Sequence, residues 1–309
     1  GLPGIDQEAT YRAMVESSTR PHANSPFGLW EKYGYMPQNL QGTSVSITLE
    51  QAFDDWCVAQ VAKRLGHMDD YERFARRAMF YKNLYDPHTG FFRPKDDQGR
   101  WIEPFDPLSY EQPCFIEGNA WQYMWFVPQD PQGLISLMGG REAFLKKLDE
   151  NFTLTATSGE RNGNASGFIG QYAHGNEPSH HTVYLYTMAG KPSRTEELVE
   201  QVRTSFYNAT PCGYAGNDDC GQMSAWYIFS SLGFYPFNAG SAEYVIGTPL
   251  FTEATLHLAG GHDFTIKARG KRDGQPHVKS VRLNGKRLRG HTLTHQQIME
   301  GDTLEFTMR

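Results

Sequence analysis

The sequence predicts a mainly helical chain built as an α/α toroid and followed by a small β domain. Up to residue 237, segments of roughly 10 to 18 residues with helical spacing of apolar side chains alternate with long loops rich in polar and aromatic residues. From residue 238 onward, short segments with period-two alternation are separated by turn residues. We therefore expect a toroid over residues 1–237 and a β domain over residues 238–309. Function is expected at the end of the helical ring where the loops gather.

The composition is that of a globular protein and argues against some classes of function. Of the 309 residues, 39% are hydrophobic and 21% are charged, which is enough apolar material for a core. The net charge of −6 argues against a nucleic-acid-binding protein, and no apolar run reaches the length of a membrane span. The aromatic content of 13% fits both a sugar-binding cleft and a helix-packed core. The sequence carries no signal peptide but starts at Gly1, which leaves its location open.

The first long helix carries two adjacent acids. Helical spacing predicts helices over residues 6–18 and 47–65, and the second ends at Gly66. Asp54 and Asp55 fall in the middle of that helix, where Asp is a poor helix former. We expect one of them to face solvent and the other to pair with a basic residue or face a pocket.

Further helices and strands follow the same two patterns. The remaining predicted helices span residues 69–84, 119–126, 131–138, 140–152, 180–188, 193–207 and 222–232. Ser193 and Glu196 have the spacing of a capping box, and Gly233 is placed to end the last helix. Strands are predicted at residues 244–246, 253–258, 263–268, 279–283 and 303–308, with a hairpin turn at Asn284-Gly285.

The basic residues of the β region and the four cysteines are not expected to form a functional site. Much of the basic charge of the β region is expected on a solvated face, for example at Lys267, Arg269, Lys271 and Arg272. The four cysteines form no CxxC pair, which argues against a zinc ribbon or a redox motif. Buried free thiols are the default expectation for cysteines. A bridge between Cys212 and Cys220, across an acidic loop, is the alternative.

Three acidic loops stand out, each at the entry to an aromatic helix. Residues 216–221 read GNDDCG and precede the helix predicted at 222–232, so Asp218 and Asp219 could be helix caps, metal ligands or a general base. Residues 174–181 read HGNEPSHH, and residues 116–123 read IEGNAWQY. Each of these two stretches places a Glu beside Gly-Asn or Asn-Pro.

The candidate catalytic acids are Glu117, Glu177 and Asp219, with Asp218 as a rival for the last. Glycoside hydrolysis needs two carboxyl groups across the sugar, one protonated and one ionised. Apolar neighbours favour the protonated form at Glu117, and the helix N-terminus favours the ionised form at Asp219. Asn176, Glu177 and Asp219 supply the oxygen ligands that Ca²⁺ prefers. The histidines of residues 174–181 lack the HExxH spacing of zinc enzymes and are expected to be hydrogen-bonding wall residues.

Several segments together resemble glycoside hydrolase family 92, the calcium-dependent exo-acting α-mannosidases. They are SVSITLEQAFDDWCVAQVAKRLG, EGNAWQYMWFVPQD, GNEPSHHTVYLY, GNDDCGQMSAWYIFSSLGFYP and THQQIMEGDTLEF. The resemblance implies an (α/α)6 toroid with a C-terminal β extension. It also implies an N-terminal β-sandwich and a start of the toroid that this chain does not contain, so a separate N-terminal fragment is an expected partner. A periplasmic or secreted location and a mannose-containing glycan as substrate, from N-glycans or mannans, follow from the same resemblance.

The resemblance also assigns roles to residues. It puts the general acid at Glu117, the general base at Asp219, and calcium ligands at Asn176, Glu177 and Asp219. Asn217 departs from the family pattern, because many members carry an acid there. The implied reaction is a single displacement with inversion.

Candidate substrate contacts and rival functions complete the set of expectations. Trp121, His180 and Asp218 are candidate substrate-binding residues. A non-catalytic glycan-binding protein on the same scaffold is one alternative, motivated by Asn217. A phosphorylase of the (α/α)6 type is the other, although the motif loops contain no basic phosphate pocket.

Overall fold

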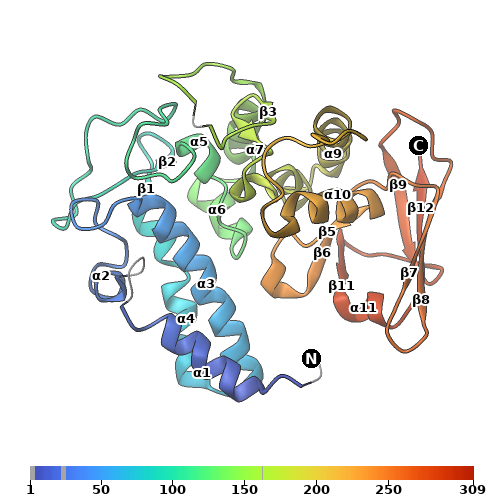
Figure 1. The fold of residues 1–309 in the computed structure, drawn as a ribbon, viewed down its shortest axis with the longest axis horizontal. Coiled ribbons are helices and arrows are strands. Elements are labelled where there is room, and N and C mark those ends of the chain that lie inside the picture. Colours follow the sequence, from blue (N-terminus) through green and yellow to red (C-terminus); the bar gives the residue numbers. More distant parts are fainter. Residues whose placement is uncertain (1–3, 22–25, 162) are drawn as a thin grey trace. The chain divides into compact units, whose positions relative to one another are not determined.

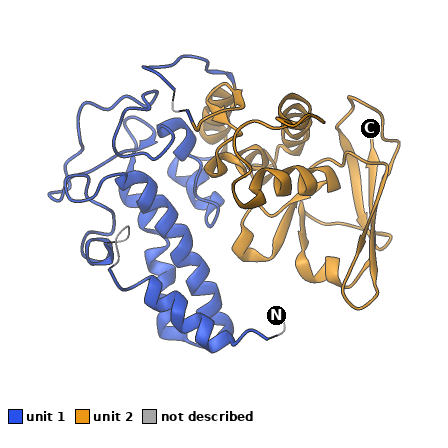
Figure 2. Ribbon diagram, in the orientation of Figure 1, with its two compact units in different colours: residues 1–140, 153–163 blue, residues 141–152, 164–309 orange. Residues whose placement is uncertain are grey.

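The computed structural model describes residues 4–21, 26–161 and 163–309. The chain divides into two compact units, which Figure 2 shows in different colours. The first contains residues 1–140 and 153–163, and the second contains residues 141–152 and 164–309. None of the helices in the described part of the chain has the length and apolar content of a transmembrane span.

The first unit is built on a helical hairpin, visible in blue and cyan in Figure 1. Its elements are α1 (Gln7–Ser17), α2 (Phe27–Tyr33), α3 (Ser44–Leu65), α4 (Met68–Arg77), the 3-10 turn η1 (Phe80–Leu84), β1 (Tyr85–Asp86), β2 (Phe91–Phe92), α5 (Ala120–Tyr123) and α6 (Pro131–Leu137). Helix α3 packs against α1 and α4. Gly66 ends α3 in the left-handed conformation with φ 86°, as predicted. The helix predicted over residues 69–84 ends earlier, because residues 80–84 tighten into η1 before the β1–β2 hairpin.

The Asp54-Asp55 pair of α3 divides as expected. Asp54 is exposed, whereas the Asp55 side chain is fully buried and pairs with Arg77 of α4. Arg77 donates to both carboxylate oxygens of Asp55, at 2.7 and 2.8 Å, and Trp30 of α2 donates to one of them at 2.8 Å. Arg77 also reaches the carbonyl of Ser18 at 2.8 Å. This ion pair therefore links α2, α3, α4 and the end of α1, and it serves the fold.

The second unit joins helices to a β region. Its first part contains α7 (Arg141–Thr153), the hairpin β3 (Phe168–Ile169) and β4 (Tyr172–Ala173), the turns η2 (Glu177–Ser179) and η3 (Thr182–Tyr184), α8 (Leu185–Met188), α9 (Pro192–Phe206), η4 (Asp219–Gly221) and α10 (Gln222–Leu232). The bounds of α10 and the left-handed Gly233 after it confirm the prediction. The predicted helix over residues 180–188 is instead broken into η3 and the short α8.

The predicted capping box at the start of α9 is wrong. The helix begins one residue earlier than predicted, with Pro192 in its first turn, and its N-cap Lys191 makes no side-chain cap. The Glu196 carboxylate turns away from the helix end and accepts from the backbone N–H of Val278 at 3.2 Å. The glutamate of the pattern therefore joins α9 to β9 instead of capping the helix.

The C-terminal strands confirm the predicted β character of that region. A five-stranded sheet has the order β10-β9-β12-β8-β7, and a three-stranded sheet has the order β11-β6-β5. The strands are β5 (Phe234–Tyr235), β6 (Glu243–Ile246), β7 (Glu253–His257), β8 (Asp263–Arg269), β9 (Val278–Leu283), β10 (Lys286–Arg287), β11 (Thr292–Thr294) and β12 (Asp302–Met308), with α11 (His295–Met299) after β11. Strand β12 is parallel to β8 and antiparallel to β9. The β9–β10 hairpin turns at Asn284 and Gly285, both with positive φ, as predicted.

One apolar core connects α10 to these strands. Leu232 at the end of α10 and Phe234 of β5 share a cluster with Phe264, Leu304 and Phe306 of the larger sheet. The predicted domain boundary after residue 237 lies within this second unit. The core therefore fixes the C-terminal end of α10, whose N-terminal end carries the acidic loop. A closed (α/α)6 toroid and the division at residue 237 stay predictions.

Candidate active site

The predicted site residues fall in both compact units. Glu117 and Trp121 belong to the first unit. The second unit holds the others, which are Asn176, Glu177, His180, Asp218 and Asp219.

The Glu117 loop is anchored to the N-terminus of α3. The first turn of a helix has free N–H groups, and here the carbonyl of Pro113 accepts from Thr43 at 2.7 Å and that of Cys114 accepts from Val45 at 3.0 Å. The backbone N–H of Ile116 donates to the hydroxyl of Ser46 at 3.0 Å. The long helix of the hairpin thus fixes the chain up to the residue before Glu117.

Glu117 itself lies between two fixed points. Asn119 caps α5, accepting from the N–H of Gln122 at 3.2 Å, so the chain is held again two residues later. Between the anchors Glu117 adopts φ 53°, in the left-handed region that non-glycine residues rarely occupy. Its side chain is exposed. A carboxylate on a strained backbone between two anchors has a restricted direction, as is common at functional sites.

A second carboxyl group lies near Glu117, and sequence reasoning missed it. Glu50 of α3 is half-buried and accepts from the hydroxyl of Tyr123 at 3.2 Å. Burial raises the pKa of Glu50, and burial also raises the pKa of Tyr123, with smaller contributions from the charges of Glu50 and then Glu117. A signal existed in the sequence, since Ser46 and Glu50 are four residues apart and share a helix face.

Trp121 has the environment of a core residue. It is 4% exposed and meets Phe91 edge-to-face, with ring centroids 5.0 Å apart. Its role in sugar binding stays a prediction.

In the second unit, two glycines bring the other acidic loops into contact. A Cβ atom on Gly175 would lie 3.1 Å from the carbonyl oxygen of Ala215, and one on Gly216 would lie 2.9 Å from the carbonyl oxygen of Gly175. Gly216 also has φ 81°. Backbone therefore meets backbone, and a side chain on Gly216 would disturb the contact. Asn176 and Glu177 directly follow one side of this contact, and the two aspartates follow the other within three residues.

The buried His174 stabilises the contact between Gly175 and Gly216 through hydrogen bonds. The Tyr207 hydroxyl donates to the carbonyl of Met223 at 3.1 Å, so its oxygen accepts from Nε2–H of His174 at 2.7 Å. Nδ1 of His174 then accepts from the Tyr172 hydroxyl at 2.7 Å. Burial lowers the pKa of His174 well below its usual value, which keeps this neutral tautomer. The hydrogen bonds join the residue before Gly175 to the first turn of α10, so His174 is hydrogen-bonded as expected, while its place in the wall of a site stays a prediction.

His180 extends the same network. Its Nε2 donates to the carbonyl of His174 at 2.9 Å, and its own carbonyl accepts from Nε1 of Trp226 at 3.0 Å. The side chain is buried, and burial lowers its pKa to about 4. His180 is therefore neutral and holds the loop against α10, while its contact with substrate stays a prediction.

The acidic loop gives its two aspartates different tasks. Asp218 accepts from both the backbone N–H and the hydroxyl of Ser224, each at 2.8 Å. These bonds lower the pKa of Asp218 and satisfy a backbone N–H in the first turn of α10, although the N-cap residue of that helix is Gly221. Asp219 is exposed at the start of η4, and within the described chain no hydrogen bond reaches its carboxylate. Asp219 is thus the acid available for chemistry.

The four cysteines are free thiols. Cys114 is buried, but Cys212 and Cys220 are exposed, so the expectation of burial is wrong for those two. The loop that contains both lies at the surface. The bridge between Cys212 and Cys220 does not form.

The predicted ligand set fits calcium by its chemistry. Asn176, Glu177 and Asp219 offer one amide oxygen and two carboxylates, which are hard oxygen donors. Zinc prefers imidazole and thiolate, and among residues 4–21, 26–161 and 163–309 no three His, Cys, Asp or Glu side chains form a metal-binding group.

A family model and solved structures match this chain along its whole length. The family model described as "Glycosyl hydrolase family 92 catalytic domain" matches residues 1–309. The family GH92 α-mannosidase BT3965 from Bacteroides thetaiotaomicron, solved in complex with mannoimidazole, is 39% identical with a TM-score of 0.95, over 100% of this chain and 41% of that one. The family GH92 inverting mannosidase BT2199 from Bacteroides thetaiotaomicron VPI-5482 is 36% identical with a TM-score of 0.90, over 100% and 44%.

A curated relative extends the comparison to a fungus. An uncharacterized secreted glycosidase from Arthroderma benhamiae is 27% identical over 350 residues, which cover 98% of this chain and 42% of the relative. The chain therefore spans less than half the length of the relatives it matches.

Proposed function

Because the chain belongs to glycosyl hydrolase family 92, we propose that it carries the catalytic loops of an exo-acting, calcium-assisted, inverting α-mannosidase. The proposed substrate is a terminal α-linked mannose of an N-glycan or mannan, and the proposed location is secreted or periplasmic. The observation that carries the proposal is the contact of the loops at Gly175 and Gly216, which collects Asn176, Glu177 and Asp219 on adjacent segments.

In the proposed reaction, Glu117 is the general acid and Asp219 the general base. Glu117 gives its proton to the glycosidic oxygen as the bond from that oxygen to the anomeric carbon breaks. Asp219 takes a proton from a water molecule whose oxygen bonds to the opposite face of the same carbon. In inverting glycosidases the two carboxyl groups are roughly 6.5–9.5 Å apart, which leaves room for this water.

The remaining residues position these groups. Asp218 holds the first turn of α10 through Ser224, so the neighbouring Asp219 sits on a fixed segment. His174 holds the segment of Asn176 and Glu177. Calcium bound by Asn176, Glu177 and Asp219 would supply a fixed positive charge that orients sugar hydroxyls, where positioning contributes several kcal/mol.

Proton NMR of α-linked mannobioses tests the proposal, with the full-length protein, in calcium and then in excess EDTA. We expect β-mannose as the first product, loss of release in EDTA and recovery with added calcium. Glu117→Gln should lower turnover by about 10²–10⁴-fold, as for loss of a general acid. Glu111→Gln, an exposed glutamate six residues earlier, is the matched control and should retain activity.

Each other outcome contradicts a definite part of the proposal. α-Mannose as the first product would exclude single displacement, and full activity in EDTA would exclude the calcium role. Turnover that depends on phosphate would indicate a phosphorylase. Sugar binding without any product would indicate a glycan-binding protein.

A further inference from the structure

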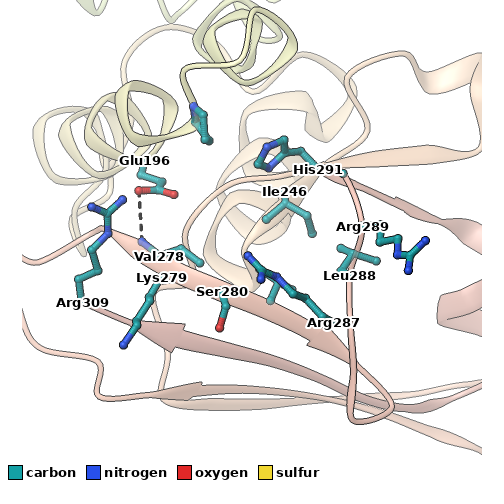
Figure 3. Close-up of a pocket in the computed structure, with 13 residues that line it drawn as sticks. Glu196, Ile246, Val278, Lys279, Ser280, Arg287, Leu288, Arg289, His291 and Arg309 are labelled. Atoms are coloured by element: carbon teal, nitrogen blue, oxygen red, sulfur yellow. Dashed lines mark hydrogen bonds between the residues drawn. The ribbon is translucent and has the colours of Figure 1, made fainter.

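A separate cavity lies in the second unit, away from the acidic loops in the sequence. Its volume is about 630 Å³, within the range of small-molecule pockets. It is formed by the first turns of α9, by β9, by the segment that follows β10 and by Arg309, as Figure 3 shows. None of the predicted site residues lines it.

The walls of this cavity carry more positive than negative charge. The basic side chains are Lys279, Arg287, Arg289 and Arg309. Among the residues that the structure describes, none of them forms a salt bridge, in contrast to two basic residues of the same sheet. Lys267 pairs with Glu253 at 3.8 Å, and Arg269 pairs with Glu305 at 2.6 Å. The solvated-face interpretation therefore suits the paired residues better than those around the cavity.

The one carboxylate side chain among the lining residues already accepts hydrogen bonds from other residues of the protein. Glu196 is 5% exposed and accepts from the N–H of Val278 and from Nδ1 of His277, each at 3.2 Å. Arg309 lies beside it in Figure 3, and its charge acts on this carboxylate. Glu196 therefore joins α9 to β9, and the cations on the other walls keep an uncompensated field.

The cavity combines a cationic and an apolar surface. Figure 3 shows Arg287 reaching across the cavity, whereas Arg289 extends away from it. Apolar side chains of Ile246, Val281 and Leu288 form part of the lining. A guanidinium matches an oxyanion with two parallel hydrogen bonds, and an apolar wall suits the C–H face of a sugar ring.

We propose that this cavity binds a sugar that carries a phosphate ester, with the phosphate on Arg287 and the ring against Ile246 and Leu288. The site is distinct from the proposed mannosidase site and its occupation requires no turnover. Free phosphate shares the anionic group, so the test must separate it from a sugar phosphate.

Isothermal titration calorimetry of the full-length protein with mannose 6-phosphate, inorganic phosphate and mannose provides that test. We expect mannose 6-phosphate to bind more tightly than inorganic phosphate and mannose not to bind at this cavity. Arg287→Ala should weaken mannose 6-phosphate binding roughly ten-fold or more, the loss expected for hydrogen bonds to a charged group. Arg287→Lys should bind with intermediate affinity, because it keeps the charge but not the fork.

Arg272→Ala is the control, since Arg272 is also exposed and lies outside the cavity. It should bind mannose 6-phosphate like the unchanged protein, and equal melting temperatures would show that the variants fold. No binding, or equal binding by Arg287→Ala and the unchanged protein, would overturn the proposal. Equal affinity for inorganic phosphate and mannose 6-phosphate would overturn the sugar part of it.

Discussion

Of the four pairs of adjacent aspartates in the sequence, one in each unit invites comparison, Asp54-Asp55 in the first unit and Asp218-Asp219 in the second. Asp54 and Asp55 lie in the middle of α3, and Asp218 and Asp219 lie in the loop before α10. In each pair one carboxylate is held by several bonds and the other is exposed.

The difference lies in what the held aspartate fixes. Asp55 pairs with a buried arginine and fixes helices against each other, so its exposed neighbour Asp54 sits on the flank of a helix. Asp218 fixes the first turn of α10 beside the contact between Gly175 and Gly216, so Asp219 is presented next to two other oxygen ligands. The same dipeptide thus serves structure in one place and proposed chemistry in the other.

The largest effect is expected at the exposed member of the loop pair. Asp219→Asn removes the proposed base and a calcium ligand, so kcat/KM on an α-mannobiose should fall by about 10²–10⁴-fold. Asp218→Asn keeps an acceptor for Ser224 and should lose far less. Steady-state kinetics at saturating calcium measures both.

Equal losses in the two variants would break the comparison, because they would mean that the loop acts as one structural unit. A large fall in melting temperature for Asp219→Asn would mean the same. A large loss of kcat/KM only in Asp219→Asn, with an unchanged melting temperature, would support the distinction between the two aspartates.

A large effect on stability is expected at the helix pair. Arg77→Ala leaves the buried Asp55 carboxylate without its counter-charge and should lower the free energy of unfolding by about 3–5 kcal/mol. Burial raises the pKa of Asp55 and Arg77 opposes that rise, so the loss should be larger at neutral than at acid pH, where the carboxyl is protonated. Urea unfolding followed by circular dichroism measures it.

Arg76→Ala is the matched control, because Arg76 is exposed on the same helix. Its free energy of unfolding should change by less than about 0.5 kcal/mol. A loss as small for Arg77→Ala would show that Asp55 is not dependent on its partner.

The fold was predictable wherever local rules decide it. Gly66 and Gly233 end their helices in the left-handed conformation, and Asn284-Gly285 turns a hairpin, because those conformations are set by single residues. The predictions failed where a distant strand competes. Glu196 binds Val278 of β9, which no local pattern at the start of α9 reveals.

The candidate site was predictable as separate loops only. The acids in Gly- and Asn-rich turns drew attention to Glu117, Glu177 and Asp219, but the contact of Gly175 with Gly216 joins segments about forty residues apart. Asp218 is held and Asp219 is not because Ser224 donates to Asp218 alone, and nothing in the helical spacing of residues 222–232 marks Ser224 for that contact. Long-range contacts of this kind lie outside any local rule.

The smallest effect is expected at Asp54. The pKa of Asp54 is raised to about 6, first because neighbouring groups remove part of the water around its carboxyl and then because of the charge of Asp55. Since an unfolded Asp titrates at about 4, the folded protein binds the extra proton between about pH 4 and pH 6, and stability falls as pH rises through this window. Asp54→Asn should remove that fall. Because the side chain is exposed and screened by water, the gain at pH 7 should be below about 1 kcal/mol.

Urea unfolding from pH 4 to pH 7 measures how the free energy of unfolding of Asp54→Asn and of the unchanged protein depends on pH. The values at pH 4 are the internal control, because Asp54 and the Asn that replaces it are then both largely neutral. An equal pH dependence of the free energy of unfolding in the two proteins would show that Asp54 is fully solvated and that only Asp55 of this pair contributes to stability.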